Sequence, residues 1–176
     1  MNRRSQSLLK RPEWSMNRAL YKSMGYSDFD LDRPMIGIAN AWSRVVPGHY
    51  NLGLVSDYVK QGIFQAGGTP VEFGVIGACD GIAEGHEGMH YILPTRDLIA
   101  NDVEMTWHFG KVNSIVFVEM IITPLELDQI TGHLLKNQKN TYLRVHYLKT
   151  DSPLDERSWK RLGLRRRYKA QIMDGR

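Results

Sequence analysis

Apolar residues follow two kinds of pattern along the first 118 positions, one typical of amphipathic helices and one typical of buried strands. Apolar residues three, four and seven positions apart predict helices, and short apolar runs bounded by turn residues predict strands. In chain order, the predicted elements are a helix over 15–24, a strand over 34–39, a helix from Leu52 to the Gly67-Gly68 pair, a strand over 71–76, a helix from Pro94 to 105 and a strand over 114–118.

This alternation predicts an α/β fold, with three layers arranged around a mainly parallel sheet. Ligands of such sheets bind beyond the carboxyl ends of the strands, and two segments, 40–49 and 77–93, follow predicted strands at that end. The second segment contains four glycines, too many for a helix interior, so we expect a continuous loop there. Pro94 is expected in the first turn of the helix that follows.

Charge divides the chain into two parts. The 176 residues suffice for one domain with a substantial core, and the net charge is +4. Residues 141–176 contain ten Lys or Arg and four Asp or Glu. We therefore predict a domain over 1–140 and a basic, poorly structured tail over 141–176. Charge runs are usually solvated, so nucleic-acid binding is not expected.

Hydropathy and the N-terminus bear on location. No apolar run approaches the roughly 20 residues that a membrane helix needs. The chain begins Met1-Asn2-Arg3-Arg4, and no long apolar stretch of the kind found in signal peptides follows. The sequence therefore predicts a cytoplasmic protein without a membrane span.

The second segment carries candidate chemistry. Its acidic and histidine side chains could bind a hard cation or transfer protons: Asp80, Glu84, His86, Glu87 and His90. Cys79 is the one cysteine of the chain and could bind iron as a thiolate. The alternative is a solvated polar loop with glycines that serve its turns. Likewise, the segment that holds Asn40 and His49 is either a second wall of the same site or a simple turn.

Four motifs in fixed order resemble one enzyme family. The motifs are Arg33-Pro34-Met35-Ile36-Gly37-Ile38-Ala39-Asn40, then Val46-Pro47-Gly48-His49, then Cys79-Asp80-Gly81-Ile82-Ala83 with Gly85-His86-Glu87-Gly88-Met89, then Leu93-Pro94-Thr95-Arg96-Asp97-Leu98-Ile99-Ala100. With these motifs, the sequence resembles the dihydroxy-acid dehydratase and phosphogluconate dehydratase family over about residues 15–118.

The resemblance implies a hydro-lyase that removes water from a dihydroxy acid to give a 2-keto acid, as in branched-chain amino acid biosynthesis. It also implies an iron–sulfur cluster, which acts as a Lewis acid, and magnesium, which holds substrate oxygens. Asp80 corresponds to the magnesium-binding aspartate of the family, and Cys79 to a cluster ligand. The substrate loops that the resemblance implies contain Asn40, Gly48, His49 and His86.

The sequence departs from the family after residue 118. The family has a Cys-Asp-Lys motif there, whereas the nearest counterpart here is Leu127-Asp128-Gln129. By this correspondence Asp128 is a weaker magnesium candidate. One cysteine cannot supply the usual three thiolates of the cluster, and a later cysteine and a catalytic serine of the family are also missing. The sequence therefore predicts an incomplete N-terminal dehydratase domain that is inactive, as a truncated or frameshifted piece.

Three alternatives stay open. The chain could act with ligands from another chain, could be a sugar-acid dehydratase of the same family, or could be a non-catalytic binding module that uses its basic tail. Three strands and about three helices leave apolar edges uncovered, which predicts poor solubility or a homodimer.

Overall fold

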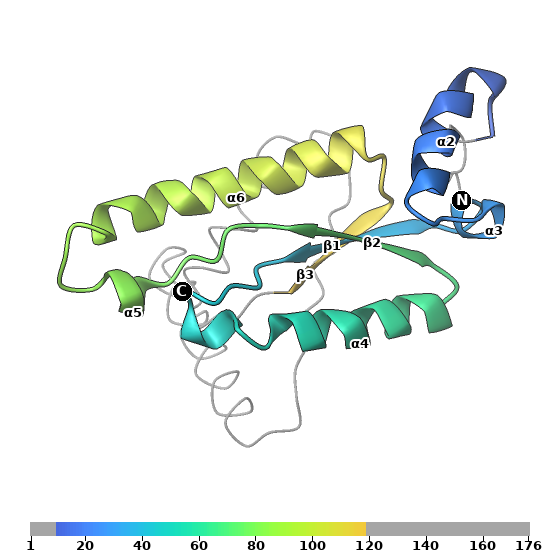
Figure 1. Ribbon diagram of the computed structural model, residues 1–176. Helices are drawn as coiled ribbons and strands as arrows, with labels where there is room; N and C mark the ends of the chain where they lie inside the picture. The colour runs from blue at the N-terminus through green and yellow to red at the C-terminus, as the bar shows by residue number, and fades with distance from the viewer. Residues whose placement is uncertain (1–9, 119–176) are drawn as a thin grey trace, which may run out of the picture.

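The computed structural model describes residues 10–118. Short helices precede the first strand, and longer helices then alternate with strands (Figure 1). The elements are η1 (Pro12–Trp14), α2 (Ser15–Ser23), α3 (Asp28–Leu31), β1 (Met35–Asn40), η2 (Pro47–His49), α4 (Leu52–Gln65), β2 (Thr69–Gly74), α5 (Asp80–Ala83), α6 (Met89–Phe109) and β3 (Ser114–Val118).

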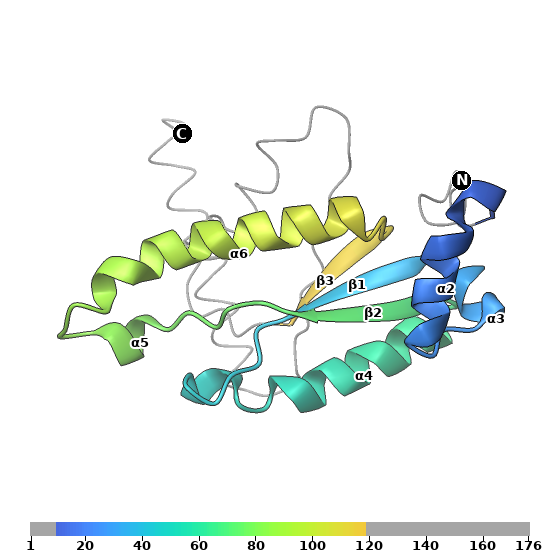
Figure 2. The ribbon, with the colours of Figure 1, turned by 45° about the horizontal axis from the view of Figure 1, so that its top comes forward.

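The three strands form one parallel sheet in the order β2-β1-β3. Helix α4 connects β1 to β2, and α6 connects β2 to β3 on the other side of β1. Because both crossovers favour the same hand, the two helices must cover opposite faces. Figure 1 and Figure 2 show this arrangement, with α6 above the sheet and α4 below it. The predicted α/β fold with three layers and a parallel sheet is confirmed.

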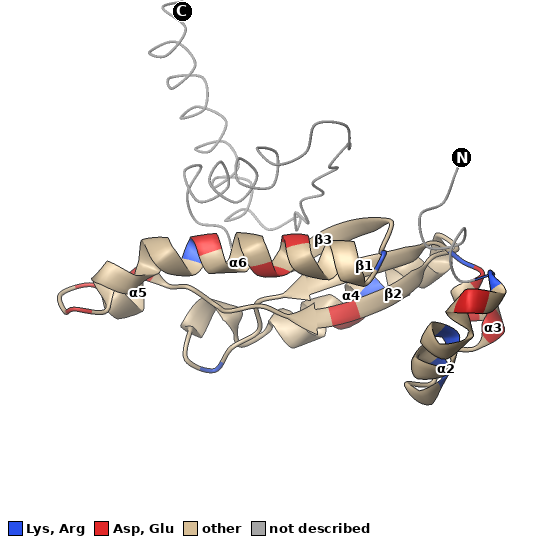
Figure 3. Ribbon diagram, turned by 90° about the horizontal axis from the view of Figure 1, so that it is seen from above, with Lys and Arg blue, Asp and Glu red and all other residues tan. Residues whose placement is uncertain are grey.

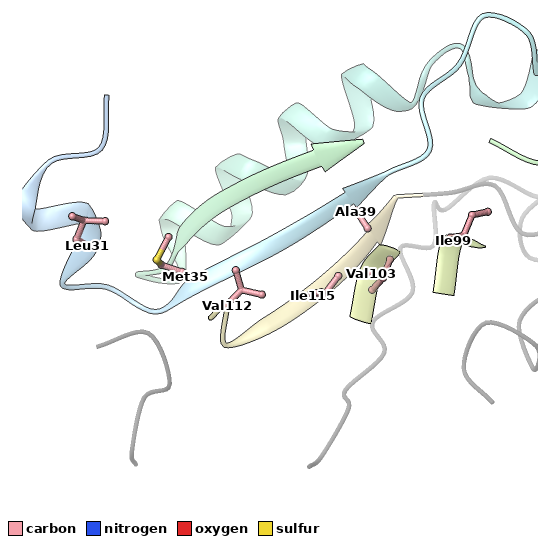
Figure 4. Close-up of a cluster of buried hydrophobic side chains, with 7 residues drawn as sticks. All are labelled: Leu31, Met35, Ala39, Ile99, Val103, Val112 and Ile115. Atoms are coloured by element: carbon pink, nitrogen blue, oxygen red, sulfur yellow. The ribbon is translucent and has the colours of Figure 1, made fainter. Parts of the chain in front are cut away.

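Alternate residues of β1 serve the two faces. The α6 face holds the larger buried cluster, which Figure 4 shows as Leu31, Met35, Ala39, Ile99, Val103, Val112 and Ile115. The α4 face holds a smaller cluster of Ile38, Ala41, Leu52 and Val118, with half-buried residues of α4 against it. A strand with apolar residues on both faces reads as a continuous run, which is why the sequence predicted it well.

Helix α4 ends as its sequence predicts. The Gly68 amide donates to the Ile63 carbonyl over 2.9 Å, and the Gly67 amide donates to the Phe64 carbonyl over 3.0 Å. Gly67 has a φ of 80°. This pair of hydrogen bonds around a residue in the left-handed region is the Schellman motif, and glycine adopts it without a Cβ penalty.

The prediction of a continuous loop over 77–93 is wrong. Residues Asp80–Ala83 form α5, and α6 begins at Met89, so Pro94 lies inside that helix instead of in its first turn. The physical reason is packing, because Ile92 is buried and extends the inner face of α6 by one turn beyond the proline. The strand predicted over 71–76 also lies slightly earlier, at Thr69–Gly74.

Helices α2 and α3 lie at the amino-terminal end of the sheet, opposite the loops that leave the strands (Figure 1). The Tyr21 hydroxyl donates to the Gly110 carbonyl, and the Tyr26 hydroxyl donates to the Pro70 carbonyl. The two tyrosine rings meet edge to face. This end of the molecule therefore serves packing, and the candidate site lies at the other end. Among the described residues, no helix has the length and apolar character needed to cross a membrane.

Candidate functional site

Two loops meet at the carboxyl end of the sheet. The first loop, residues 41–51, follows β1, and the second loop, residues 75–88, follows β2 and includes α5. They begin side by side, because the Val75 amide donates to the Asn40 carbonyl over 3.0 Å. Figure 1 shows both loops at the end of the sheet away from α2. Most of the candidate residues from the sequence lie in these two loops, whereas Asn40 is the last residue of β1 and His90 lies in α6.

Asn40 uses both ends of its side-chain amide inside the protein. Its Nδ2 donates to Glu72 over 2.7 Å, and its Oδ1 accepts from the Trp42 amide over 2.9 Å. The Trp42 indole Nε1 in turn donates to the Tyr50 carbonyl over 3.0 Å. Asn40 is buried. The structure therefore supports a positioning role for Asn40, and its contact with substrate stays a prediction.

His49 is the buried anchor of the first loop, with 2% of its surface exposed. Its Nδ1 lies 2.9 Å from the Ala41 carbonyl oxygen. A carbonyl oxygen only accepts, so Nδ1 carries the hydrogen, and in the neutral ring Nε2 has the lone pair. Gly48 lies beside His49 in η2. Backbone bonding thus fixes the tautomer of the imidazole.

Gly77 brings the second loop against this histidine. A Cβ atom at position 77 would lie 2.7 Å from His49 Nδ1 and 3.1 Å from the Ala41 carbonyl oxygen. Neither group can move easily, because they are bonded to each other. The absence of a side chain at Gly77 is therefore what lets the two loops pack together.

Glu72 on β2 accepts hydrogen bonds from three side chains, one at the end of β1 and two on α4. Its Oε1 accepts from Asn40 and from the Ser56 hydroxyl, and its Oε2 accepts from Lys60 Nζ over 2.6 Å. Lys60 also pairs with Asp57 over 3.0 Å. Burial by itself would raise the pKa of Glu72, but the hydrogen bonds from Lys60, Ser56 and Asn40 outweigh it and lower the pKa. The carboxylate is therefore held in its charged form.

The second loop presents Asp80 and Cys79. Asp80 is the first residue of α5 and Cys79 is its cap, and both are partly exposed. Arg96 of α6 donates through Nη2 to both Asp80 oxygens, at 2.9 and 3.1 Å. The Arg96 side chain is 11% exposed and that of Asp80 is 46% exposed. The guanidinium thus holds the carboxylate from the protein side and leaves its outer side to solvent.

His86 is bonded within its own loop. The Gly88 amide donates to His86 Nδ1 over 3.0 Å, so Nε2 carries the hydrogen and donates to the Ile82 carbonyl over 2.8 Å. This tautomer is the opposite of that of His49. Glu84, Glu87 and His90 are exposed, and His90 lies in the first turn of α6. A substrate contact by His86 stays a prediction.

The donor set fits the two inorganic groups differently. Magnesium is often held by one or two carboxylates together with water and substrate, so the half-exposed Asp80 fits as one ligand. A cluster needs several thiolates, and the whole sequence has one, so Cys79 by itself does not fit an iron–sulfur cluster. Within residues 10–118, no three His, Cys, Asp or Glu side chains are placed to hold a metal ion. Asp128 lies outside the described residues.

The fold and the residues at the carboxyl end of the sheet define a class of protein. It is an α/β domain whose candidate ligand residues lie beyond the carboxyl ends of parallel strands. The sequence model described as dihydroxy-acid/6-phosphogluconate dehydratase N-terminal matches residues 33–120, half of the chain. The chain belongs to this family. The matched residues include β1, β2, β3 and both loops, so the match covers the part of the chain that forms the candidate site.

Curated relatives agree with this membership. A dihydroxy-acid dehydratase of Ignicoccus hospitalis is 51% identical over 108 residues, which cover 61% of this chain and 20% of the relative. One from Methanococcus maripaludis is 58% identical over 90 residues, or 51% of this chain and 16% of the relative. One from Pyrococcus furiosus is 46% identical over 122 residues, or 68% and 22%. The chain thus spans about a fifth of the length of these relatives.

Sequence reasoning missed the residues that support the site. Arg96 lies in the last of the four motifs and Glu72 lies between the second and the third, but the sequence predicted no contact for either. One signal was available, because Ser56 and Lys60 lie four residues apart and so share one face of α4. This spacing does not show that Glu72 lies opposite the two side chains, because that contact depends on the packing of α4 against β2.

Proposed function

We propose that this chain supplies the magnesium-binding part of the active site of a dihydroxy-acid dehydratase. The observation that carries the proposal is Asp80, which lies beyond β2 in a segment that matches the family and keeps an exposed side. Magnesium bound there would stabilise negative charge on the oxygens of the substrate. The substrate proposed is a 2,3-dihydroxy acid, which loses hydroxide from one carbon and a proton from its neighbour to give a 2-keto acid.

The residues of the chain have distinct parts in this proposal. Arg96 holds the Asp80 carboxylate in one orientation, so that its outer side faces the ligand. His49 forms the wall of the first loop with a fixed tautomer. We propose no turnover by this chain alone, because Cys79 is its one thiol and a cluster needs further ligands. The ligands of the complete site would come from sequence that the relatives have outside the match.

A graft into a relative tests the proposal. Residues 33–118 of this chain would replace the matching segment of the Ignicoccus hospitalis enzyme, and dehydration of a branched 2,3-dihydroxy acid would be measured. We expect activity within about tenfold of the parent and a loss of at least about 100-fold for Asp80→Asn in the graft. A folded graft without activity would contradict the proposal. Higher activity on a sugar acid would favour the alternative substrate.

Other expectations from the sequence stay predictions. Residues 10–118 contain nine Lys or Arg and twelve Asp or Glu, and Figure 3 shows both kinds spread over this part of the chain. This net negative charge argues against nucleic acid as a ligand of residues 10–118. The basic tail lies outside the described residues, and so does the boundary at 140. The cytoplasmic location and the homodimer are likewise untested.

A further inference from the structure

Glu72 of β2 links helix α4 to the end of β1, where the first loop begins. Three donors converge on it, Ser56 and Lys60 from α4 and Asn40 from the end of β1. Ser56 is fully buried. Neither the candidate ligands nor the sequence motifs explain why a carboxylate stands at this position of β2.

Asn40 transmits the position of this carboxylate to the first loop. Its Nδ2 faces an oxygen of Glu72, so its Oδ1 must face the other way, where it accepts from the Trp42 amide. Trp42 then donates to the Tyr50 carbonyl near the start of α4. The chain of hydrogen bonds therefore runs from β2 across β1 and spans the loop that contains His49.

The side chain at position 72 must have two terminal atoms that both accept hydrogen bonds. Oε1 accepts from Asn40 and Ser56, and Oε2 accepts from an ammonium group. Glutamine would place its NH2 group against either the Lys60 ammonium or the Asn40 NH2 group, and two donors that face each other are unfavourable. If Asn40 turned over to relieve this, its NH2 group would face the Trp42 amide instead.

We propose that Glu72 is a positioning residue that fixes the first loop through Asn40. The inference rests on the proposed function, since the loop matters there as a wall of the active site. It deepens that function by naming what holds His49 in place relative to the second loop.

Amide hydrogen exchange on the full chain tests this directly. In Glu72→Gln we expect the Trp42 amide to exchange at least about tenfold faster, while amides of α6 around Val103 change by less than about threefold. The indole N–H signal of Trp42 should shift as its bond to Tyr50 weakens. Asp57→Asn is the matched control, because it removes only the outer partner of Lys60 and should leave Trp42 unchanged.

A double variant separates hydrogen bonding from general damage. Glu72→Gln with Lys60→Met removes the ammonium, so the glutamine oxygen can again accept from Asn40, and Trp42 protection should return to within about threefold of the parent. Unchanged Trp42 exchange in Glu72→Gln would overturn the proposal. Equal acceleration of amide exchange at Trp42 and in α6 would also overturn the proposal. Failure of the double variant to restore the protection of Trp42 would overturn it as well. The double variant decides the proposal if the single variant does not fold. None of these measurements needs turnover, so their outcome does not depend on whether the graft is active.

Discussion

The first loop is tied to the body of the domain through buried side chains, whereas the second loop beyond Gly77 is held mainly by its own backbone. His49 and Asn40 lie below the surface and bond to groups on neighbouring elements. Among residues 10–118, His86 bonds only to nearby backbone, and Asp80 has one partner side chain, Arg96. The difference teaches that one loop acts as a frame, while the other presents groups that are available to a ligand.

The largest expected difference between the two loops is the loss of stability when the histidine of each loop is replaced. His49→Ala should lower the free energy of unfolding by about 3 kcal/mol, because it leaves a cavity and an unpaired carbonyl. His86→Ala should lower it by about 0.5 kcal/mol, since the side chain is exposed. Urea unfolding of both variants measures the two values. Similar losses for the two would mean that the loops are equally built into the fold.

The second-largest effect on stability is expected at Gly77, where the two loops are in contact. Gly77→Ala should cost about 1–3 kcal/mol of stability, because its Cβ would overlap with His49. Gly74→Ala is the matched control, since a Cβ there meets no atom of residues 10–118 within 4 Å. Urea unfolding again measures both variants. If the two alanine variants were equally stable, the close approach of the loops at Gly77 would be refuted.

Acid should weaken the frame through Glu72. Its pKa in the folded chain lies below the ordinary 4.5, so the unfolded chain takes up the proton first as the pH falls. This contribution is complete above about pH 5.5 and is lost as the pH falls through the lower, folded pKa. Unfolding midpoints measured between about pH 6 and pH 3 should therefore fall less steeply for Glu72→Gln than for the parent. Asp30, whose pKa is also lowered, is present in both proteins. Parallel curves would contradict the role of the carboxylate.

The smallest effect on stability is expected at the proposed ligand. Asp80→Asn should lower stability by about 0.5 kcal/mol, because the Asp80 carboxylate is half-exposed and the asparagine oxygen can still accept from Arg96. The same change in the graft should abolish most of the dehydration. Thermal unfolding and activity of the two forms provide the comparison. A large loss of stability would place Asp80 in the frame with His49.

The sequence by itself determined the succession of strands and longer helices along the chain, the mainly parallel three-layer fold and the family, whereas the order β2-β1-β3 within the sheet came from the structure. These depend on patterns that are local along the chain, such as the apolar run of β1 and the glycine pair after α4. Proximity in the chain also placed Cys79 and Asp80 together in one motif. The extra turn of α6 was missed because burial of Ile92 overrides the preference of proline for the first turn of a helix.

Only the tertiary structure decided which side chains hold these motifs. Asn40 meets Glu72 from 32 positions away, and Arg96 meets Asp80 from 16. The parallel crossover through α4 brings Asn40 and Glu72 together on neighbouring strands, whereas the turn between α5 and α6 brings Arg96 back to Asp80. The two histidine tautomers depend on which carbonyl or amide lies beside each ring, and no spacing in the sequence encodes that neighbour.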